Sequence, residues 1–243
     1  MTLCFMEAQP HNSFSRVPFV SEPKILFEDQ HLIVVEKPAG YLSQEDGSDA
    51  PCLVSWLRAH VGRNYVGVVH RLDRNTSGLM VYAKRSKAAA RLTESLQDGT
   101  LHRRYQALLW GVGLPQTFEW RDRLFKDEKT NVARVVSPNS NHRDAKEAVL
   151  TGKVLEQKST ATLCEFELQT GRSHQIRVQC SSRKFPLVGD QKYDSSFQSR
   201  AVKFSRPALH SCYLSFPHPM RSEEILRFNS PLPNDMDVLW KKL

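Results

Sequence analysis

The stretch HRLDRNTSG at residues 70–78 is a polar segment between two apolar runs, Val66–Val69 before it and Leu79–Ala83 after it. Both runs have the composition of short strands, so the segment is predicted to be a turn that connects them. Two roles for Asp73 fit such a turn. Its carboxylate either accepts backbone N–H bonds and caps the turn, or it is an ionised group at the end of a strand with two arginines beside it. The spacing alone favours the structural role.

A second polar segment, TGRSHQIRV at residues 170–178, follows the predicted strand at residues 163–168. A glycine turn ends that strand, and the next strand is predicted to begin with Gln175, Arg177 and Gln179 on one face. An arginine on an otherwise apolar strand needs a partner if it is buried. Arg177 is therefore either exposed at a sheet edge or paired with a carboxylate such as Asp73.

The rest of the pattern is that of many short strands and few helices. Residues 25–27 and 32–35 flank a polar step and predict a hairpin. One helix is clear, with Ser86 as its N-cap, apolar residues at one-face spacing after it, and Gly99 just past its end. Further strands are predicted at residues 104–110, 163–168, 175–179, 212–216 and 224–228. This combination predicts an α+β fold dominated by antiparallel sheet.

Residues 121–146 differ from the remainder because they carry seven basic side chains and few large apolar ones. We interpret them as an exposed basic excursion, with a solvated surface loop as the alternative. The basic residues are Arg121, Arg123, Lys126, Lys129, Arg134, Arg143 and Lys146.

Bulk properties narrow the class of protein. The net charge of +8 favours a polyanionic partner such as nucleic acid or an anionic membrane surface. The five cysteines are odd in number and form no C-x-x-C pair, which disfavours a disulfide framework or a zinc site and suggests a reducing compartment.

Residues 1–23 are expected to be a leader with no signal-peptide pattern, and residues 24–243 one catalytic domain. No run reaches the roughly 20 apolar residues that span a bilayer, so we expect a cytoplasmic location.

Several familiar motifs are absent from the sequence. It contains no G-x-x-x-x-G-K-[ST] phosphate loop, no G-x-G-x-x-G after a strand and no G-x-S-x-G elbow. His and Cys are not clustered at the spacing that metal ions require. The sequence therefore lacks the usual signs of dependence on a nucleotide, flavin or zinc.

The two polar segments and three shorter ones occur together in a recognisable order. Taken over residues 25–231, the sequence resembles the RluA-type family of RNA pseudouridine synthases. Residues 70–79 match H-R-L-D-x-x-T-S-G-[LV], and residues 171–178 match G-R-[ST]-H-Q-[IL]-R-V. Shorter matches are KPAG at 37–40, PLVGD at 186–190, and LH at 209–210 with FPHP at 216–219. Five matches in order reverse the preference for a structural Asp73.

The resemblance implies a pseudouridine synthase fold, with flanking helices and loops around a central RNA-binding cleft. It implies an isomerase that flips out a uridine of rRNA or tRNA, breaks its glycosidic bond and rejoins the base through carbon. The catalytic residues that it implies are Asp73, Tyr105 and Arg177, with Arg103 standing where the family's K-x-Y pattern has lysine. Arg71 is implied to enter the base stack when the uridine leaves it. The RNA-binding candidates are His70, Arg71, Arg74, Arg103, Arg172, His174 and Gln175.

Some questions stay open at this stage. Asp73 acts either as a nucleophile on the ribose or as a base that takes a proton from it. An isomerisation requires no cofactor by its stoichiometry, and a structured rRNA or tRNA hairpin is the expected partner of a monomeric enzyme. Several relatives carry an N-terminal S4 RNA-binding module, for which the short leader has no room. The alternatives are a catalytically silent RNA-binding protein on the same fold and a carbohydrate hydrolase with paired carboxylates.

Overall fold

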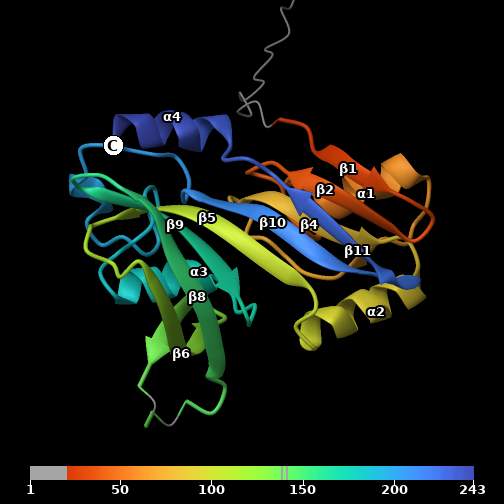
Figure 1. The fold of residues 1–243 in the computed structure, drawn as a ribbon, viewed down its shortest axis with the longest axis horizontal. Helices are drawn as coiled ribbons and strands as arrows, with labels where there is room; N and C mark the ends of the chain where they lie inside the picture. Colours follow the sequence, from red (N-terminus) through yellow and green to blue (C-terminus); the bar gives the residue numbers. More distant parts are fainter. Residues whose placement is uncertain (1–20, 138, 141) are drawn as a thin grey trace, which may run out of the picture.

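Strand β10 (Leu209–His218) lies at the centre of one mixed sheet, in the computed structural model that describes residues 21–137, 139–140 and 142–243. The strands run in the order β1-β2-β4-β10-β5-β9-β8-β6-β7, while β11 pairs with β10 and β3 pairs with β4 (Figure 1). Only the β4–β10 pair is parallel among the described strands. The other strands are β1 (Lys24–Glu28), β2 (Leu32–Lys37), β3 (Gly67–Val68), β4 (Ser77–Ala83), β5 (His102–Trp110), β6 (Thr117–Asp127), β7 (Val132–Val136), β8 (Lys146–Gln157), β9 (Ala161–Leu168) and β11 (Arg221–Asn229).

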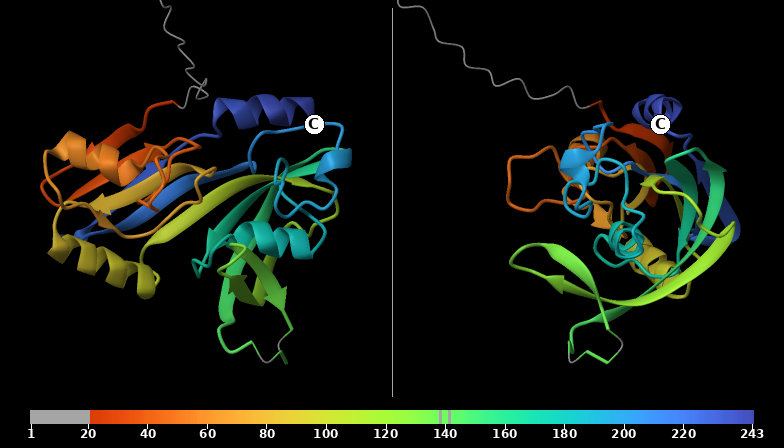
Figure 2. Two further views of the ribbon diagram at one scale, coloured as in Figure 1. Left: turned by 180° about the vertical axis from the view of Figure 1, so that it is seen from behind. Right: turned by 90° about the vertical axis from the view of Figure 1, so that its left-hand side faces the viewer.

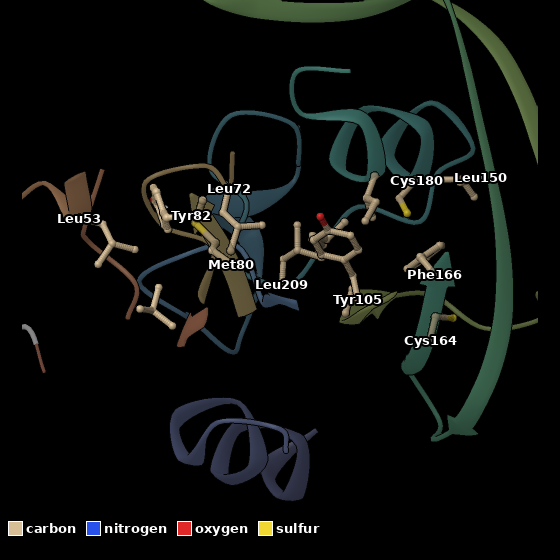
Figure 3. Close-up of a cluster of buried hydrophobic side chains, with 14 of the residues drawn as sticks. Leu53, Leu72, Met80, Tyr82, Tyr105, Leu150, Cys164, Phe166, Cys180 and Leu209 are labelled. Atoms are coloured by element: carbon tan, nitrogen blue, oxygen red, sulfur yellow. Dashed lines mark hydrogen bonds between the residues drawn. The ribbon is translucent and has the colours of Figure 1, made fainter. Parts of the chain in front are cut away.

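Helices cover both faces of the sheet. On one face α1 and α3 pack over a core that contains Tyr82, Tyr105 and Phe166 (Figure 3). On the other face α2 covers β2 and β4, and α4 covers β5. The helices are α1 (Leu53–Val61), α2 (Ser86–Gln97), α3 (Gln175–Ser182), α4 (Asn234–Lys242) and the short 3-10 helix η1 (Phe197–Ser199). The predicted α+β fold with a mostly antiparallel sheet is confirmed.

The two halves of the sheet meet where β4 pairs with β10 in parallel. A Cβ at Gly78 would lie 2.2 Å from the carbonyl oxygen of Ser211, and Gly78 has a φ of +116°. Only glycine permits both this close backbone approach and this conformation. The glycine that closes the HRLDRNTSG segment therefore fixes that segment at the junction of the two halves.

One predicted strand is wrong. Residues 175–179 form the start of helix α3 rather than a strand. Residues 175–180 are all buried, so their alternation of polar and apolar side chains carries no information about an exposed face. His174, with a φ of +54°, turns the chain, and its carbonyl accepts the N–H of Val178 at 2.9 Å to begin the helix.

The basic excursion interpreted at residues 121–146 is the β6–β7 hairpin and the start of β8, and the hairpin extends from the body of the protein (Figures 1 and 2). The alternative of a surface loop is wrong. Leu124 and Ala133 on the hairpin belong to one apolar cluster with Val178 of α3. Helices α1 and α4 were also not predicted. The predicted hairpin of β1 and β2 and the helix α2 are confirmed, although α2 begins at Ser86 itself with Arg85 as its N-cap.

A buried hydrogen-bond chain joins three of the central strands. The Ser77 hydroxyl donates to Nδ1 of His210 at 2.9 Å, and His210 Nε2 donates to the Ser230 hydroxyl at 2.9 Å. The Ser230 hydroxyl donates its one proton to Glu36 Oε1 at 2.9 Å, so it must accept from His210 Nε2, and His210 Nδ1 must accept from Ser77. Burial, and to a lesser degree the charge of Arg206, lowers the pKa of His210 to about 4, so the imidazole is neutral in the folded protein.

This histidine makes stability depend on pH. The folded-state pKa lies below the ordinary value near 6.5, so below that pH the unfolded chain binds a proton that the folded protein excludes. We expect His210 to lower the free energy of unfolding by about 2 kcal/mol between pH 7 and pH 5. Urea unfolding at the two pH values measures this loss. The difference should shrink in His210→Gln and persist in His102→Gln, which changes an exposed histidine; equal differences in all three proteins would contradict the assignment.

Candidate active site

A cleft of about 1300 Å³ opens on the face of the sheet that carries α1 and α3. It is lined by residues 68–75 and 168–174, the two polar segments singled out in the sequence, and by residues 189–192. Tyr105 on β5 lies between them. The fold thus brings segments a hundred residues apart in the chain to one concave surface.

The loop that carries Asp73 is held by its backbone. The Thr76 N–H donates to the Asp73 carbonyl at 3.0 Å, and the Leu72 N–H donates to the Ser43 hydroxyl at 3.0 Å. The carbonyl of Arg74 accepts hydrogen bonds from Gly40 N–H and from Lys37 Nζ. The turn therefore closes without the Asp73 side chain, whose carboxylate is left free to face the cleft.

The buried amine of Lys37 binds the backbone of this loop at Arg74. It is fully buried, and its Nζ donates to the carbonyls of Pro38, Tyr41 and Arg74 at 2.8–3.1 Å. Burial lowers the pKa of Lys37 to about 7, against the attraction of Asp73. Three carbonyl acceptors match the three N–H bonds of an ammonium group, so the protonated form of Lys37 is fully hydrogen-bonded next to the loop.

Arg177 binds two carboxylates at once. Its Nη1 donates to Asp73 Oδ2 at 2.9 Å, while its Nε and Nη2 donate to the two oxygens of Asp190 at 2.7 and 2.9 Å. Burial disfavours the charge, but the hydrogen bonds and charges of the two aspartates outweigh it and raise the pKa of Arg177. The sequence prediction that Arg177 pairs with Asp73 is confirmed, although Arg177 projects from a helix.

Asp190 was not predicted as a site residue, although the PLVGD segment that contains it was noted. It is fully buried, and its Oδ1 also accepts the N–H groups of Lys192 and Tyr193. A Cβ at the preceding Gly189 would lie 2.1 Å from the carbonyl of Arg206, so the turn requires glycine there. Only the spacing of glycine before an acidic residue could have indicated this role, and it does not name the partner.

His174 lies beside the same carboxylate. Its Nε2 is 3.9 Å from Asp73 Oδ2, and its Nδ1 is 2.7 Å from the Tyr193 hydroxyl. That hydroxyl accepts the N–H of Ala133 on β7 at 2.9 Å, which leaves its own proton for His174. Burial, only partly opposed by Asp73, lowers the pKa of His174. A neutral ring with Nε2–H toward Asp73 follows from this arrangement.

Tyr105 is largely enclosed by the core. It is 4% exposed and belongs to the apolar cluster that includes Leu72 and Ile176, with its hydroxyl at the end remote from β5 (Figure 3). Desolvation raises the pKa of Tyr105, although the charge of Arg103 opposes it. The ring thus forms part of the cleft wall, next to the loop that carries Asp73.

Six of the seven predicted RNA-binding residues fall into two groups, and the seventh, His174, is half-buried. Arg71, Arg74 and Arg172 are exposed in the cleft lining. His70, Arg103 and Gln175 are buried. Gln175 accepts hydrogen bonds from the Thr170 hydroxyl and the Arg172 N–H, and donates to the Val149 carbonyl, so its side chain braces the 170–174 turn.

Two negative findings apply to the described residues alone. Outside residues 1–20, 138 and 141, no group of three or more His, Cys, Asp or Glu side chains is placed to hold a metal ion. Over the same residues, no helix is long and apolar enough to cross a membrane.

Comparison with known proteins identifies the family to which this sequence is similar. The sequence model described as RNA pseudouridylate synthase matches residues 31–182. The chain is 37% identical over 227 residues to "Uncharacterized RNA pseudouridine synthase YlyB" of Bacillus subtilis, covering 90% of this chain and 72% of that protein. It is 37% identical to "Ribosomal large subunit pseudouridine synthase D" of Nitrosomonas europaea, covering 89% of this chain but 64% of that protein.

The fold is also similar to solved structures. "Human RNA Pseudouridylate Synthase Domain Containing 1" aligns with a TM-score of 0.71 over 91% of this chain and 94% of that chain. "Human RNA Pseudouridylate Synthase Domain Containing 4" aligns with a TM-score of 0.69 over 88% of this chain and 90% of that chain. The sequence identities are 21% and 24%, so these likenesses bear on the fold alone.

Removing the charge of Asp190 should destabilise the fold much more than removing the charge of Asp73. Asp190→Asn leaves a buried guanidinium without its main partner and should lower the free energy of unfolding by about 3 kcal/mol or more. Asp73 is 29% exposed, and Arg177 retains Asp190 when Asp73 is changed, so Asp73→Asn should cost less than about 1 kcal/mol. Urea unfolding of the three proteins tests this order. A larger loss in Asp73→Asn would show that Asp73, not Asp190, anchors the arginine.

Proposed function

Because this chain belongs to the RNA pseudouridylate synthase family, we propose that it converts a uridine of large-subunit ribosomal RNA to pseudouridine, with Asp73 as the group that acts on the ribose. The observation that carries this proposal is the Asp73 carboxylate, held 2.9 Å from Arg177 Nη1 at the centre of a large polar cleft. The ribosomal target is taken from relatives named for it and from the net charge of +8.

The reaction rearranges bonds without oxidation or reduction. The N1–C1′ bond of the uridine breaks, a C5–C1′ bond forms, and a proton leaves C5 while N1 gains one. Asp73 initiates cleavage either by attacking the ribose or by taking a proton from it. Arg177 orients the carboxylate through a charged hydrogen bond. No cofactor is required by this balance.

The uridine must leave its stack before the glycosidic bond can be reached, at a cost of a few kcal/mol. We assign Arg71, exposed beside Asp73 in the cleft, to fill the gap and contact phosphates. Tyr105 is assigned to pack against the extruded base, where stacking contributes about 1–3 kcal/mol. The exposed Arg74 and Arg172 then serve as phosphate contacts on either side of the cleft.

Neither alternative from the sequence fits as well. A silent RNA-binding protein would not need an aspartate oriented by a buried arginine, and the chain retains Asp73, Tyr105 and Arg177. A hydrolase needs a second free acid near Asp73. The neighbouring carboxylate, Asp190, is fully buried and accepts hydrogen bonds from Arg177 and two backbone N–H groups.

We further propose that residues 24–243 act as one catalytic domain, in the cytoplasm and as a monomer on a structured RNA. Support for a single domain comes from the sheet, which runs without interruption from β1 to β7. The leader predicted for residues 1–23 falls mainly outside the described residues, and no role is assigned to it.

The direct test of this function is Asp73→Asn. Asparagine keeps the shape but is neither a nucleophile nor a carboxylate base, so pseudouridine formation should fall below about 1% of wild type, which corresponds to about 3 kcal/mol of lost transition-state stabilisation. Pseudouridine is scored in large-subunit rRNA transcripts by carbodiimide modification and primer extension. The matched control is Asp46→Asn, an exposed cleft carboxylate, which should retain activity. Turnover by Asp73→Asn above a few per cent of wild type would refute the assignment.

The basic hairpin can be divided by the structure into two kinds of cation. Lys126 lines the cleft and pairs with one exposed carboxylate, Glu128, whereas Arg121 pairs with both Glu119 and Glu147 and is not part of the lining. Removing a true phosphate contact should reduce the slope of log K against log salt by about one unit. We therefore expect Lys126→Ala to give a shallower slope and Arg121→Ala to leave it unchanged. Filter binding from 50 to 300 mM KCl measures both, and an unchanged slope in Lys126→Ala would remove the hairpin from the binding surface.

A further inference from the structure

Arg103 carries a buried charge that has no partner among the described residues. It lies on β5 two residues before Tyr105, so both side chains project from the same face of the sheet. Arg103 is 6% exposed and lines the cleft, and its Nε is buried without a hydrogen bond. Unpaired buried charges are costly, so an arginine in this state needs an explanation.

His70 is a second unsatisfied group in the same lining. It is 5% exposed, and its Nε2 accepts the Val81 N–H at 3.3 Å. Burial, aided by the charge of Arg103, lowers the pKa of His70 to about 3, so the ring is neutral. Its proton is then on Nδ1, which is buried with no acceptor. Both unsatisfied groups are therefore donors.

Both groups line the same cleft. Arg103 also faces the second polar segment, because a Cβ at Gly171 would lie 3.1 Å from Arg103 Nη1. Glycine at that position gives the guanidinium its space. Arg103 and His70 together present several N–H donors to the cleft. The protein supplies no acceptor for Arg103 Nε or His70 Nδ1 among the described residues, so the site suits a ligand that accepts hydrogen bonds.

We infer that Arg103 and His70 form a subsite for a phosphate group of the RNA, next to the nucleotide that Asp73 acts on. This inference rests on the proposed function. A phosphate supplies both a negative charge and several acceptor lone pairs, whereas a uracil carbonyl is neutral and leaves Arg103 unpaired. The planar fork of a guanidinium matches two phosphate oxygens, which the ammonium of a lysine cannot do. Arg103 is thus a positioning residue that fixes the RNA backbone.

The first experiment measures stability without RNA. Arg103→Met keeps the aliphatic stem but removes an unpaired buried charge, so its melting temperature should equal or exceed that of wild type. Inorganic phosphate should raise the melting temperature of wild type above that in chloride of equal ionic strength, and should not do so in Arg103→Met. The control is Arg104→Met, because Arg104 on the opposite face already pairs with Glu165 at 3.0 Å. A lower melting temperature for Arg103→Met than for Arg104→Met, or an equal phosphate effect in both, would overturn the inference.

The second experiment locates the phosphate on the RNA. We expect Arg103→Met to raise the Kd for the rRNA transcript at least tenfold and to reduce the salt slope by about one unit, with Arg104→Met near wild type. Methylphosphonate is then placed at each phosphate flanking the target uridine of a synthetic hairpin. At one position it should weaken binding to wild type but cause no further loss in Arg103→Met. Additive losses at every position would refute the subsite. A wild-type protein that forms no pseudouridine would instead refute the proposed function, while the phosphate shift in melting temperature still tests Arg103.

Discussion

The guanidinium of Arg177 connects the three segments from which the cleft is built. It projects from α3, binds Asp190 in the 189–193 turn through two hydrogen bonds, and reaches Asp73 in the 70–76 loop through a third. Two negative charges around one cation leave the buried arginine satisfied, and the loss of Asp190, the fully buried partner, would be expensive. Because Asp190 holds one side of the guanidinium rigidly, the remaining N–H is aimed at Asp73. The orientation of the exposed acid is therefore set by a buried one.

The backbone supplies the second constraint. Gly78 and Ser211 bring β4 against β10 where the two halves of the sheet meet, and the hydrogen-bond chain through His210 ties these strands to β2. The loop before Gly78 must then emerge at the centre of the sheet. Lys37 and Gly40 hold that loop by the Arg74 carbonyl, and the Arg74 side chain returns a hydrogen bond to the Gly40 carbonyl. Asp73 is placed by its neighbours' main-chain bonds, which leaves its carboxylate available for chemistry.

The sequence predicted the parts of the fold in which one face is exposed and the other buried. Strand β9, predicted at residues 163–168, alternates clearly, with Cys164 and Phe166 in the core. The same rule failed at residues 175–180, where burial on all sides made a helix resemble a strand. Asp73 and its pairing with Arg177 were predictable because the motifs name both residues. Asp190 and Tyr193 were missed because their roles arise from tertiary contacts, which no spacing within one segment specifies.

The buried basic side chains in and beside this cleft follow two patterns. Some are fully hydrogen-bonded within the protein, and one is not. Lys37 donates to three carbonyls, and the guanidinium of Arg177 is paired with two carboxylates. Arg103, nearly as buried, has no such match among the described residues. A polar interior tends to be satisfied unless a ligand completes it. In the proposed reaction, the paired side chains fix the geometry of Asp73 before RNA binds and the unpaired Arg103 holds the RNA, so the proposal assigns catalytic orientation and binding energy to different charges.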